Sequence, residues 1–225
     1  MKLVNSRLGL EIDLLENQIL NLTIESPEYF SEVLSNICKQ VDGEEGEFIL
    51  SEVEKELSLS KKAMVVANPL SVSCNEKRIL SQLYKELAEV VCKDCAEKFA
   101  ELNQYILYFV DEIINSVEYN LVSDVDCSAI GLIKYCNVHM DTCYDSLAEQ
   151  FIDYLRAMKK ICGIDIVFVL NLKQYFNMME LQEIYKHCFY LKIFLINLEG
   201  VKTDPIQGDR YIVLDKDQCI LDLLY

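Results

Sequence analysis

Between residues 75 and 130 the sequence contains neither glycine nor proline. Apolar residues recur there every three or four positions, beginning with Ile79, Leu83 and Leu87. This spacing gives an amphipathic helix one apolar face. The stretch therefore predicts one very long helix, or two helices joined end to end, finishing near residues 119–120.

Two further helices are predicted after it, over about residues 127–135 and 143–161, with Asp141 and Thr142 as the cap of the second. No strand pattern separates the helices of this region. We therefore expect an α-helical leg domain over residues 86–162, inserted between two segments of different character.

The N-terminal segment has strand periodicity. Apolar and polar residues alternate over residues 1–25, with Glu16-Asn17 as the expected hairpin connection. Ser26-Pro27 then marks the start of a helix that runs to about Gln40. Short strands are expected over residues 48–50 and 62–67.

The C-terminal segment predicts a strand, a helix and two more strands over residues 164–170, 178–188, 190–197 and 211–214. A strand, a short helix and another apolar strand form a βαβ unit with parallel pairing. Because neither end of the chain carries enough strands alone, both ends must meet in one sheet. The predicted fold is thus an α/β head domain, residues 1–85 and 163–225, with the helical leg inserted in sequence.

The charge restricts how the protein could bind nucleic acid. With 21 Lys and Arg against 37 Asp and Glu, the 225-residue chain carries a net charge of −16. A general coat of basic residues is therefore excluded, and binding to DNA or RNA needs a local basic surface or a bound cation. Lys85 and Lys93 share one helical stripe, whereas Arg156, Lys159 and Lys160 gather at the end of another helix. A closed oligomer that aimed such groups into one channel would multiply their contacts.

Common catalytic motifs are missing from the sequence. It contains neither G-x-x-x-x-G-K-[ST], G-x-G-x-x-G nor G-x-S-x-G. The loop after Val66, residues 67–71, has no glycine to approach a phosphate and no lysine at the required step. We therefore expect no nucleotide binding. With His139 and His187 as the only histidines, a Cys/His dyad would depend on chance proximity.

The ten cysteines resemble a disulfide framework only at first sight. The chain shows no secretory signal pattern and no apolar run long enough for a membrane, so a cytoplasmic location is expected. Thiols stay reduced there and pack as small apolar side chains. Cys92 and Cys95 have redox or zinc spacing, but no second such pair follows.

Residues 99–133 contain six carboxylates and neither lysine nor arginine; Lys98 lies just before this stretch and Lys134 just after it. Such carboxylates repel one another, and a hard cation with oxygen ligands would relieve the repulsion. Asp124-x-Asp126-x-Ser128 copies the first steps of an EF-hand loop but lacks its glycine and its final glutamate. From the residue pattern alone, a solvated acidic face is favoured over a metal site.

The order and spacing of several segments resemble a known family, the ring-forming adaptation protein of type II-A CRISPR loci (the "Csn-two" family). The resemblance covers nearly the whole chain. It is clearest in the segments at residues 65–70, 131–134, 166–171, 181–183, 191–195 and 209–214. These are features of the fold more than of a chemical site.

The resemblance implies a head similar to degenerate P-loop ATPases, without a nucleotide site, and a helical leg. It implies a non-enzymatic, calcium-dependent homotetrameric ring that binds the ends of double-stranded DNA without sequence specificity. Such a ring serves antiviral defence by assisting spacer acquisition beside the CRISPR integrase complex and the RNA-guided nuclease.

The family's functional residues carry over to particular positions of this chain. The acidic calcium segment maps to residues 112–126, where the expected ligands are Glu112, Glu118, Asn120, Asp124 and Asp126. The channel lysine carried over most directly is Lys134, followed by Lys159 and Lys160. Lys85 is a candidate only because it shares one side of a helix with Lys93, and not through the resemblance.

Two hypotheses stay open at this point. One is the DNA-end-binding ring. The other is a small cytoplasmic α/β enzyme with an unrecognised site, either a nucleotide hydrolase or a thiol-dependent protein that uses Cys92 and Cys95. Mass measurements with and without calcium would separate them.

Overall fold

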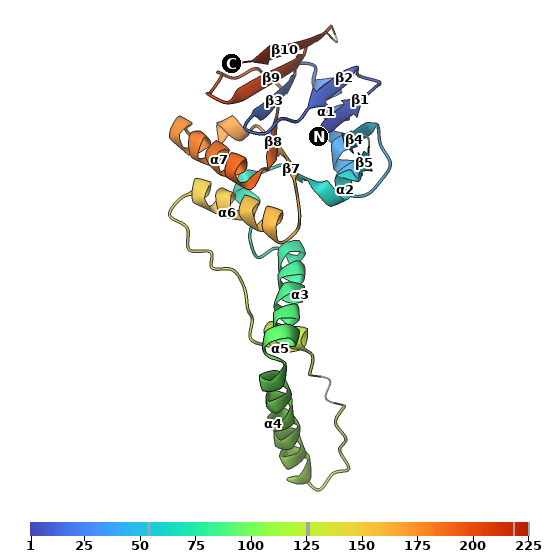
Figure 1. Ribbon diagram of the computed structural model, residues 1–225, viewed down its shortest axis with the longest axis vertical. Coiled ribbons are helices and arrows are strands. Elements are labelled where there is room, and N and C mark those ends of the chain that lie inside the picture. The colour runs from blue at the N-terminus through green and yellow to red at the C-terminus, as the bar shows by residue number, and fades with distance from the viewer. Residues whose placement is uncertain (54, 125–126, 218, 225) are drawn as a thin grey trace. The chain divides into compact units, whose positions relative to one another are not determined.

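The computed structural model describes residues 1–224 except residues 54, 125–126 and 218. The chain forms two compact units (Figure 1). The first combines Met1–Cys74 with Thr142–Tyr225, and we call it the head; the second is Asn75–Asp141, and we call it the leg. The insertion predicted from the sequence is present, but its predicted bounds, residues 86 and 162, differ from these.

The head is built on a six-stranded sheet in the order β10-β9-β3-β8-β7-β6. Its strands are β3 (Ile19–Ile24), β6 (Ala63–Val66), β7 (Ile166–Leu170), β8 (Phe194–Glu199), β9 (Asp209–Leu214) and β10 (Ile220–Leu224). The N-terminal strand β3 pairs in parallel with β8 on one side and with β9 on the other. The prediction that both ends of the chain meet in one sheet is confirmed. The apolar run of β7 follows from burial on both faces, as parallel sheets require.

The expected βαβ unit is also present. Helix α7 (Met178–Leu191) joins β7 to β8, and the two strands pair in parallel. Asn177 caps α7: its side chain accepts from the amides of Met179 and Glu180, while the Glu180 carboxylate accepts from the Asn177 amide. Because this helix continues to Leu191, β8 begins later than the sequence pattern predicts.

A second, four-stranded sheet in the order β2-β1-β4-β5 was not predicted. It contains β1 (Lys2–Asn5), β2 (Leu10–Asp13), β4 (Phe48–Glu52) and β5 (Lys55–Leu57), all antiparallel. The hairpin expected at Glu16-Asn17 is wrong. The tight turn lies at residues 6–9, where Gly9 has a φ of +64°, and Asn17 lies in the link between the two sheets. The alternation of apolar and polar residues shows which face of a strand is buried, but it does not show which other strand pairs with it.

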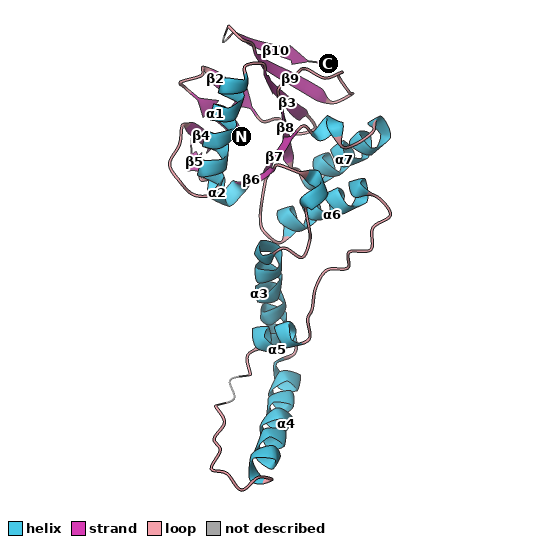
Figure 2. Ribbon diagram, turned by 180° about the vertical axis from the view of Figure 1, so that it is seen from behind, coloured by secondary structure: helices cyan, strands magenta, loops and turns pink. Residues whose placement is uncertain are grey.

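Helices cover both faces of the large sheet (Figure 2). Helix α1 (Pro27–Val41) and the small sheet share one apolar core with it, through side chains such as Leu22, Val33 and Leu3. On the other face lie α7 and α6 (Leu147–Lys160), which pack against each other. The remaining short helices of the head are α2 (Leu59–Lys62), η1 (Pro69–Ser71) and η2 (Leu172–Gln174).

Helix α6 explains the difference in domain bounds. It buries seven of its side chains, among them Phe151 and Leu155, within the head. Its cap is Ser146, which accepts from the Glu149 amide, and not Asp141-Thr142 as predicted. The sequence shows the amphipathic face of this helix but not which unit covers that face.

The leg contains α3 (Lys77–Asp94), α4 (Ala96–Asn115) and α5 (Ala129–Tyr135). The alternative of two helices joined end to end is confirmed, because Cys95, with φ −127° and ψ 15°, interrupts the helical backbone. Helix α4 ends at Asn115, a few residues before the predicted end. Helix α5 packs against α3.

A buried polar network lies within the head sheet. The Lys173 ammonium, whose side chain is 7% exposed, lies 2.7 Å from a carboxylate oxygen of Asp209 and 2.6 Å from the Tyr211 hydroxyl. The other Asp209 oxygen accepts from the Asn21 amide at 2.9 Å, and Asn21 accepts from Asn197 at 3.0 Å. These contacts join strands β3, β8 and β9 to the segment that follows β7.

Asp165 joins two other parts of the head. Its carboxylate lies 2.7 Å from the Lys62 ammonium at the end of α2 and 2.6 Å from the Lys159 ammonium on α6. Burial opposes the charge on Asp165, but hydrogen bonds from Lys159 and Lys62 outweigh this effect and lower the pKa of the carboxyl group.

Acidification is therefore expected to destabilise the head through Asp165. A carboxyl group whose pKa is lower in the folded chain stabilises the fold above its unfolded pKa of about 3.9. That stability is lost as the pH falls through the folded pKa. Urea unfolding at stepped pH should show a loss below about pH 4 that is smaller in Asp165→Asn. Identical pH profiles for the two proteins would contradict this role.

Candidate nucleic-acid interface

A groove of about 550 Å³ lies in the leg between α3 and α5. Its walls combine cations with apolar and aromatic side chains: Lys77, Leu80, Tyr84, Lys85, Ile130 and Lys134. On α3 the positions of Lys77 and Lys85 are two steps of four residues apart, which places them along one side of the helix. The α5 side is supplied by Ile130 and Lys134.

Local capping fixes the start of α5. The Ser128 hydroxyl accepts from the Gly131 amide at 3.1 Å. A Cβ atom at position 131 would lie only 3.0 Å from that hydroxyl oxygen, so glycine leaves the cap unobstructed. The cap therefore helps to set where Ile130 and Lys134 lie relative to α3.

The segment after α5, residues 136–140, is hydrogen-bonded to α3 and to Asn75, which lies just before that helix. The Tyr84 hydroxyl donates to the Val138 carbonyl at 2.9 Å. The Asn75 amide group donates to the Met140 carbonyl at 3.0 Å and accepts from the Met140 amide at 2.8 Å. These bonds hold the Tyr84 ring in place along the groove.

The three groove lysines are electrostatically uncompensated. Neither Lys77, Lys85 nor Lys134 forms an ion pair with any residue that the structure describes. By contrast, Lys93, which was grouped with Lys85 in the sequence, pairs with Glu89 at 3.1 Å. Three unpaired cations on one groove attract an anionic ligand even on an acidic chain.

The structure thus brings together two of the predicted DNA-binding residues, Lys85 and Lys134, and adds Lys77. Sequence reasoning missed Lys77 because it lies at the very start of α3. The signal that could have found it is the repeat of a polar residue every four positions at Lys77, Ser81 and Lys85.

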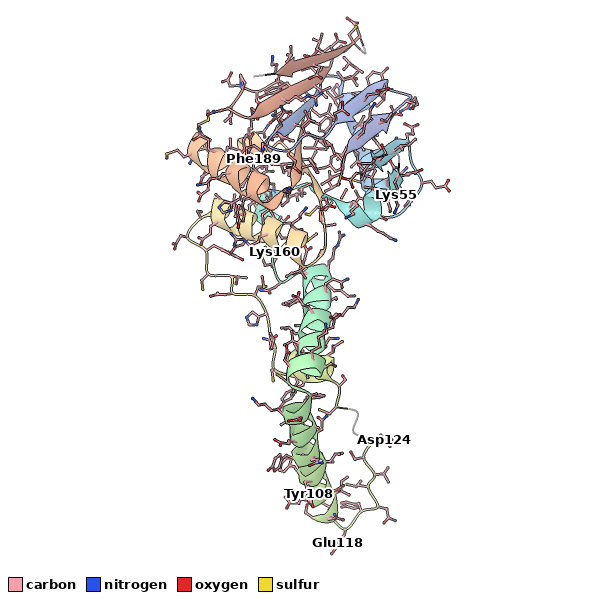
Figure 3. All side chains as sticks on the ribbon, viewed as in Figure 1. Lys55, Tyr108, Glu118, Asp124, Lys160 and Phe189 are labelled. Carbon is pink, nitrogen blue, oxygen red and sulfur yellow. The ribbon has the colours of Figure 1, made fainter. Side chains whose placement is uncertain are left out.

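The other two predicted DNA-binding lysines lie in the head and not in the leg. Lys159 is paired with Asp165 and also donates to the Lys192 carbonyl at 3.0 Å. Lys160, labelled in Figure 3, is exposed at the end of α6. The expectation that both lie on the helical leg is wrong, because α6 is buried against the head.

The predicted calcium ligands are spread along the leg. Glu112 lies on α4, Glu118 lies at the turn after that helix, and Asp124 lies farther along the returning segment (Figure 3). Asn120 lies between the last two, and Asp126 falls outside the described residues. Among the residues that the structure describes, no three His, Cys, Asp or Glu side chains gather closely enough to hold a metal. The oxygen donors suit calcium chemically, but within one chain their described positions do not form a site.

The cysteines and histidines lie in separate places. Cys92 is exposed in the last turn of α3, and Cys95 forms the break before α4. His139 is in the leg segment that follows α5, where its Nδ1 lies 2.6 Å from the Asn137 carbonyl oxygen. Beside His187 on α7, burial raises the pKa of the Cys188 thiol to about 12, so this thiol stays protonated.

No helix in the described part of the chain is both long and apolar enough to span a membrane.

The fold and the groove define a mixed α/β protein with an inserted helical unit that carries a basic surface. The sequence profile of the family described as CRISPR-associated protein (Cas_Csn2) matches residues 40–218. The chain therefore belongs to the Cas_Csn2 family of CRISPR-associated proteins, as its resemblance to that family predicted. Membership implies a role associated with CRISPR adaptation.

Solved structures support the fold. The crystal structure of Stu0660 of Streptococcus thermophilus matches this chain with a TM-score of 0.59 and 12% sequence identity. The match covers 100% of this chain and 76% of that one. Comparison with curated protein sequences found no significant match.

Proposed function

We propose that this protein forms a homotetrameric ring that binds the ends of double-stranded DNA without sequence specificity. In this role it assists spacer acquisition together with the CRISPR integrase complex and the RNA-guided nuclease. The observation that carries the proposal is the leg groove, where three unpaired lysines converge on a chain of net charge −16. Lysines that reach phosphates bind DNA of any sequence.

Assembly strengthens what a single groove does weakly. Each phosphate that a lysine neutralises releases counterions, so binding grows stronger with the number of contacts. The same release makes binding depend on salt: for each contact, the logarithm of the affinity falls by roughly 0.9 per decade of salt concentration. Three lysines on one subunit provide few contacts, whereas four subunits around one duplex provide four such sets. The ring therefore supports DNA binding by multiplying a small basic surface.

Helix α4 offers the surface for this assembly. None of its twenty residues is buried. Tyr105 and Tyr108 are 74% and 75% exposed, and Phe109 is 63% exposed. Soluble monomers rarely leave such a continuous apolar surface in water. A second copy of the chain is the partner that we propose for it, because a second copy supplies a matching apolar surface of the same kind.

Charge then favours a role for calcium in the contact. Between Phe99 and Asn115, helix α4 carries Glu101, Asp111 and Glu112 and no basic residue. Two copies that meet along this helix would bring carboxylates together, which costs free energy unless a cation lies nearby. We therefore extend the proposal to calcium held by carboxylates of the leg, with Glu112, Glu118, Asn120 and Asp124 as the described candidates and Asp126 as the predicted fifth. The ion would relieve this repulsion between subunits.

The proposal also treats the protein as non-enzymatic and unable to use nucleotides. The central strand β3 is followed by Glu25-Ser26-Pro27, which offers neither glycine nor lysine to a phosphate group. The loop after β6 is likewise occupied by η1, where the Asn68 side chain accepts from the Leu70 amide. Both observations support the expectation that the head has no nucleotide site.

Substituting Tyr108 with aspartate is expected to reduce the tetramer to smaller species at micromolar concentration. The change places a charge in the exposed apolar surface of α4 and adds to the local carboxylate repulsion. Light scattering with calcium present measures the mass, and chelation of calcium should lower it in the unmodified protein too. Tyr190→Asp is the matched control, because Tyr190 is 83% exposed on α7. A monomeric unmodified protein, or equal masses for all three proteins, would contradict self-association through α4.

A further inference from the structure

The groove between α3 and α5 is more than a row of cations. A protein that only tracks the phosphate backbone needs lysines on an open surface. Here the three ammonium groups surround side chains that do not bind phosphate: Leu80, Ile130 and the ring of Tyr84. The Tyr84 hydroxyl is occupied by the Val138 carbonyl, so the ring contributes its face and not a free polar group.

A nucleobase is the part of DNA that matches such a surface. Bases stack on aromatic and apolar side chains when they are not stacked on their neighbours. A volume of about 550 Å³ lies within the range of pockets that hold small ligands. A base pair within a duplex is not free to enter, because both of its faces are already stacked. An unpaired nucleotide at a strand terminus has at least one base face that is not stacked on a neighbouring base.

We propose that the α3–α5 groove takes one unpaired nucleotide at the end of a DNA strand. Its base lies against Leu80, Ile130 and Tyr84, and its phosphates lie near Lys77, Lys85 and Lys134. This inference rests on the proposed binding of DNA ends and refines which ends are preferred. Ends with a single-stranded overhang bind better than blunt ends.

The test compares blunt duplexes with otherwise identical duplexes that carry a short 5′ or 3′ overhang, by fluorescence anisotropy at fixed salt. At least one kind of overhang should bind at least about fivefold tighter than the blunt end, the effect of stacking one base. Equal affinity for all three duplexes would overturn this inference but leave the proposed function standing. Failure of every duplex to bind would overturn both.

Variants separate the base from the phosphates. Ile130→Ala should remove the preference for the overhang, because it removes part of the apolar surface against which the base lies. Lys134→Ala should weaken blunt and overhanging duplexes by the same factor. Val90→Ala is the control, since Val90 is an exposed apolar residue of α3 that does not line the groove. An Ile130→Ala protein that keeps the full preference would count against the groove as the base site.

Discussion

Asp209→Ala is expected to lower the free energy of unfolding of the head by about 3–5 kcal/mol, the cost of removing one partner from a buried ion pair. The Lys173 ammonium would stay buried without its carboxylate, and the Asn21 amide would lose its acceptor. Urea unfolding followed by circular dichroism measures the change. Asp209→Asn, which keeps the size and one acceptor, should fall between the alanine variant and the unmodified protein.

Glu16→Ala is the matched control for this prediction. Glu16 also pairs with a cation, Lys192, at 3.4 Å, but the two side chains are 59% and 68% exposed. Exposed pairs contribute about 0–1 kcal/mol, so the control should change stability little. Equal losses in the two alanine variants would show that the buried network does not stabilise the head as described.

Reversing the charge of either Lys85 or Lys134 is expected to weaken binding to linear duplex DNA by at least about tenfold at moderate salt. Each change removes one phosphate contact and adds a repulsive carboxylate, and a ring of four repeats it four times. The slope of log affinity against log salt should become shallower by about 0.9 for each lost contact. Gel-shift titrations at several salt concentrations measure both quantities.

The control for these variants is Lys186→Glu on α7, which gives the same net charge at an exposed position of the head. Its affinity should stay within about twofold of the unmodified protein, because distant surface charges are screened by salt. Light scattering on each variant checks that assembly is intact. Similar losses in all three variants would mean that overall charge, and not the groove, governs binding.

Several elements of the fold could be predicted because their cause is local. Proline at the first position of α1, the absence of glycine and proline in α3 and α4, and the apolar run of β7 each determine a structure within a few residues. The joining of both chain ends in one sheet also followed, since too few strands were available at either end. What the sequence could not show was which surfaces meet. The assignment of α6 to the leg and the hairpin at Glu16-Asn17 both failed for this reason.

For the candidate site, too, the sequence predicted single residues but not how they pack together. Helical spacing alone predicted Lys85, and the family resemblance predicted Lys134, but only the packing of α5 against α3 places them on one groove with Lys77. Lys159 looked equally suitable in the sequence. Its partner Asp165 is six residues away, in the link between α6 and β7, where no helical repeat would reveal the pair. The polar network around Asp209 was missed because Asn21 and Asn197 read as interruptions of apolar strands.

The most direct measurement of the central claim compares linear duplex DNA with a covalently closed circle of the same sequence. A ring that binds DNA ends must be threaded, so calcium-loaded protein should bind the linear form and should not be displaced by an excess of the circle. Chelation of calcium should weaken binding to the linear form. Equal affinity for the two forms, unchanged by chelator, would contradict the account.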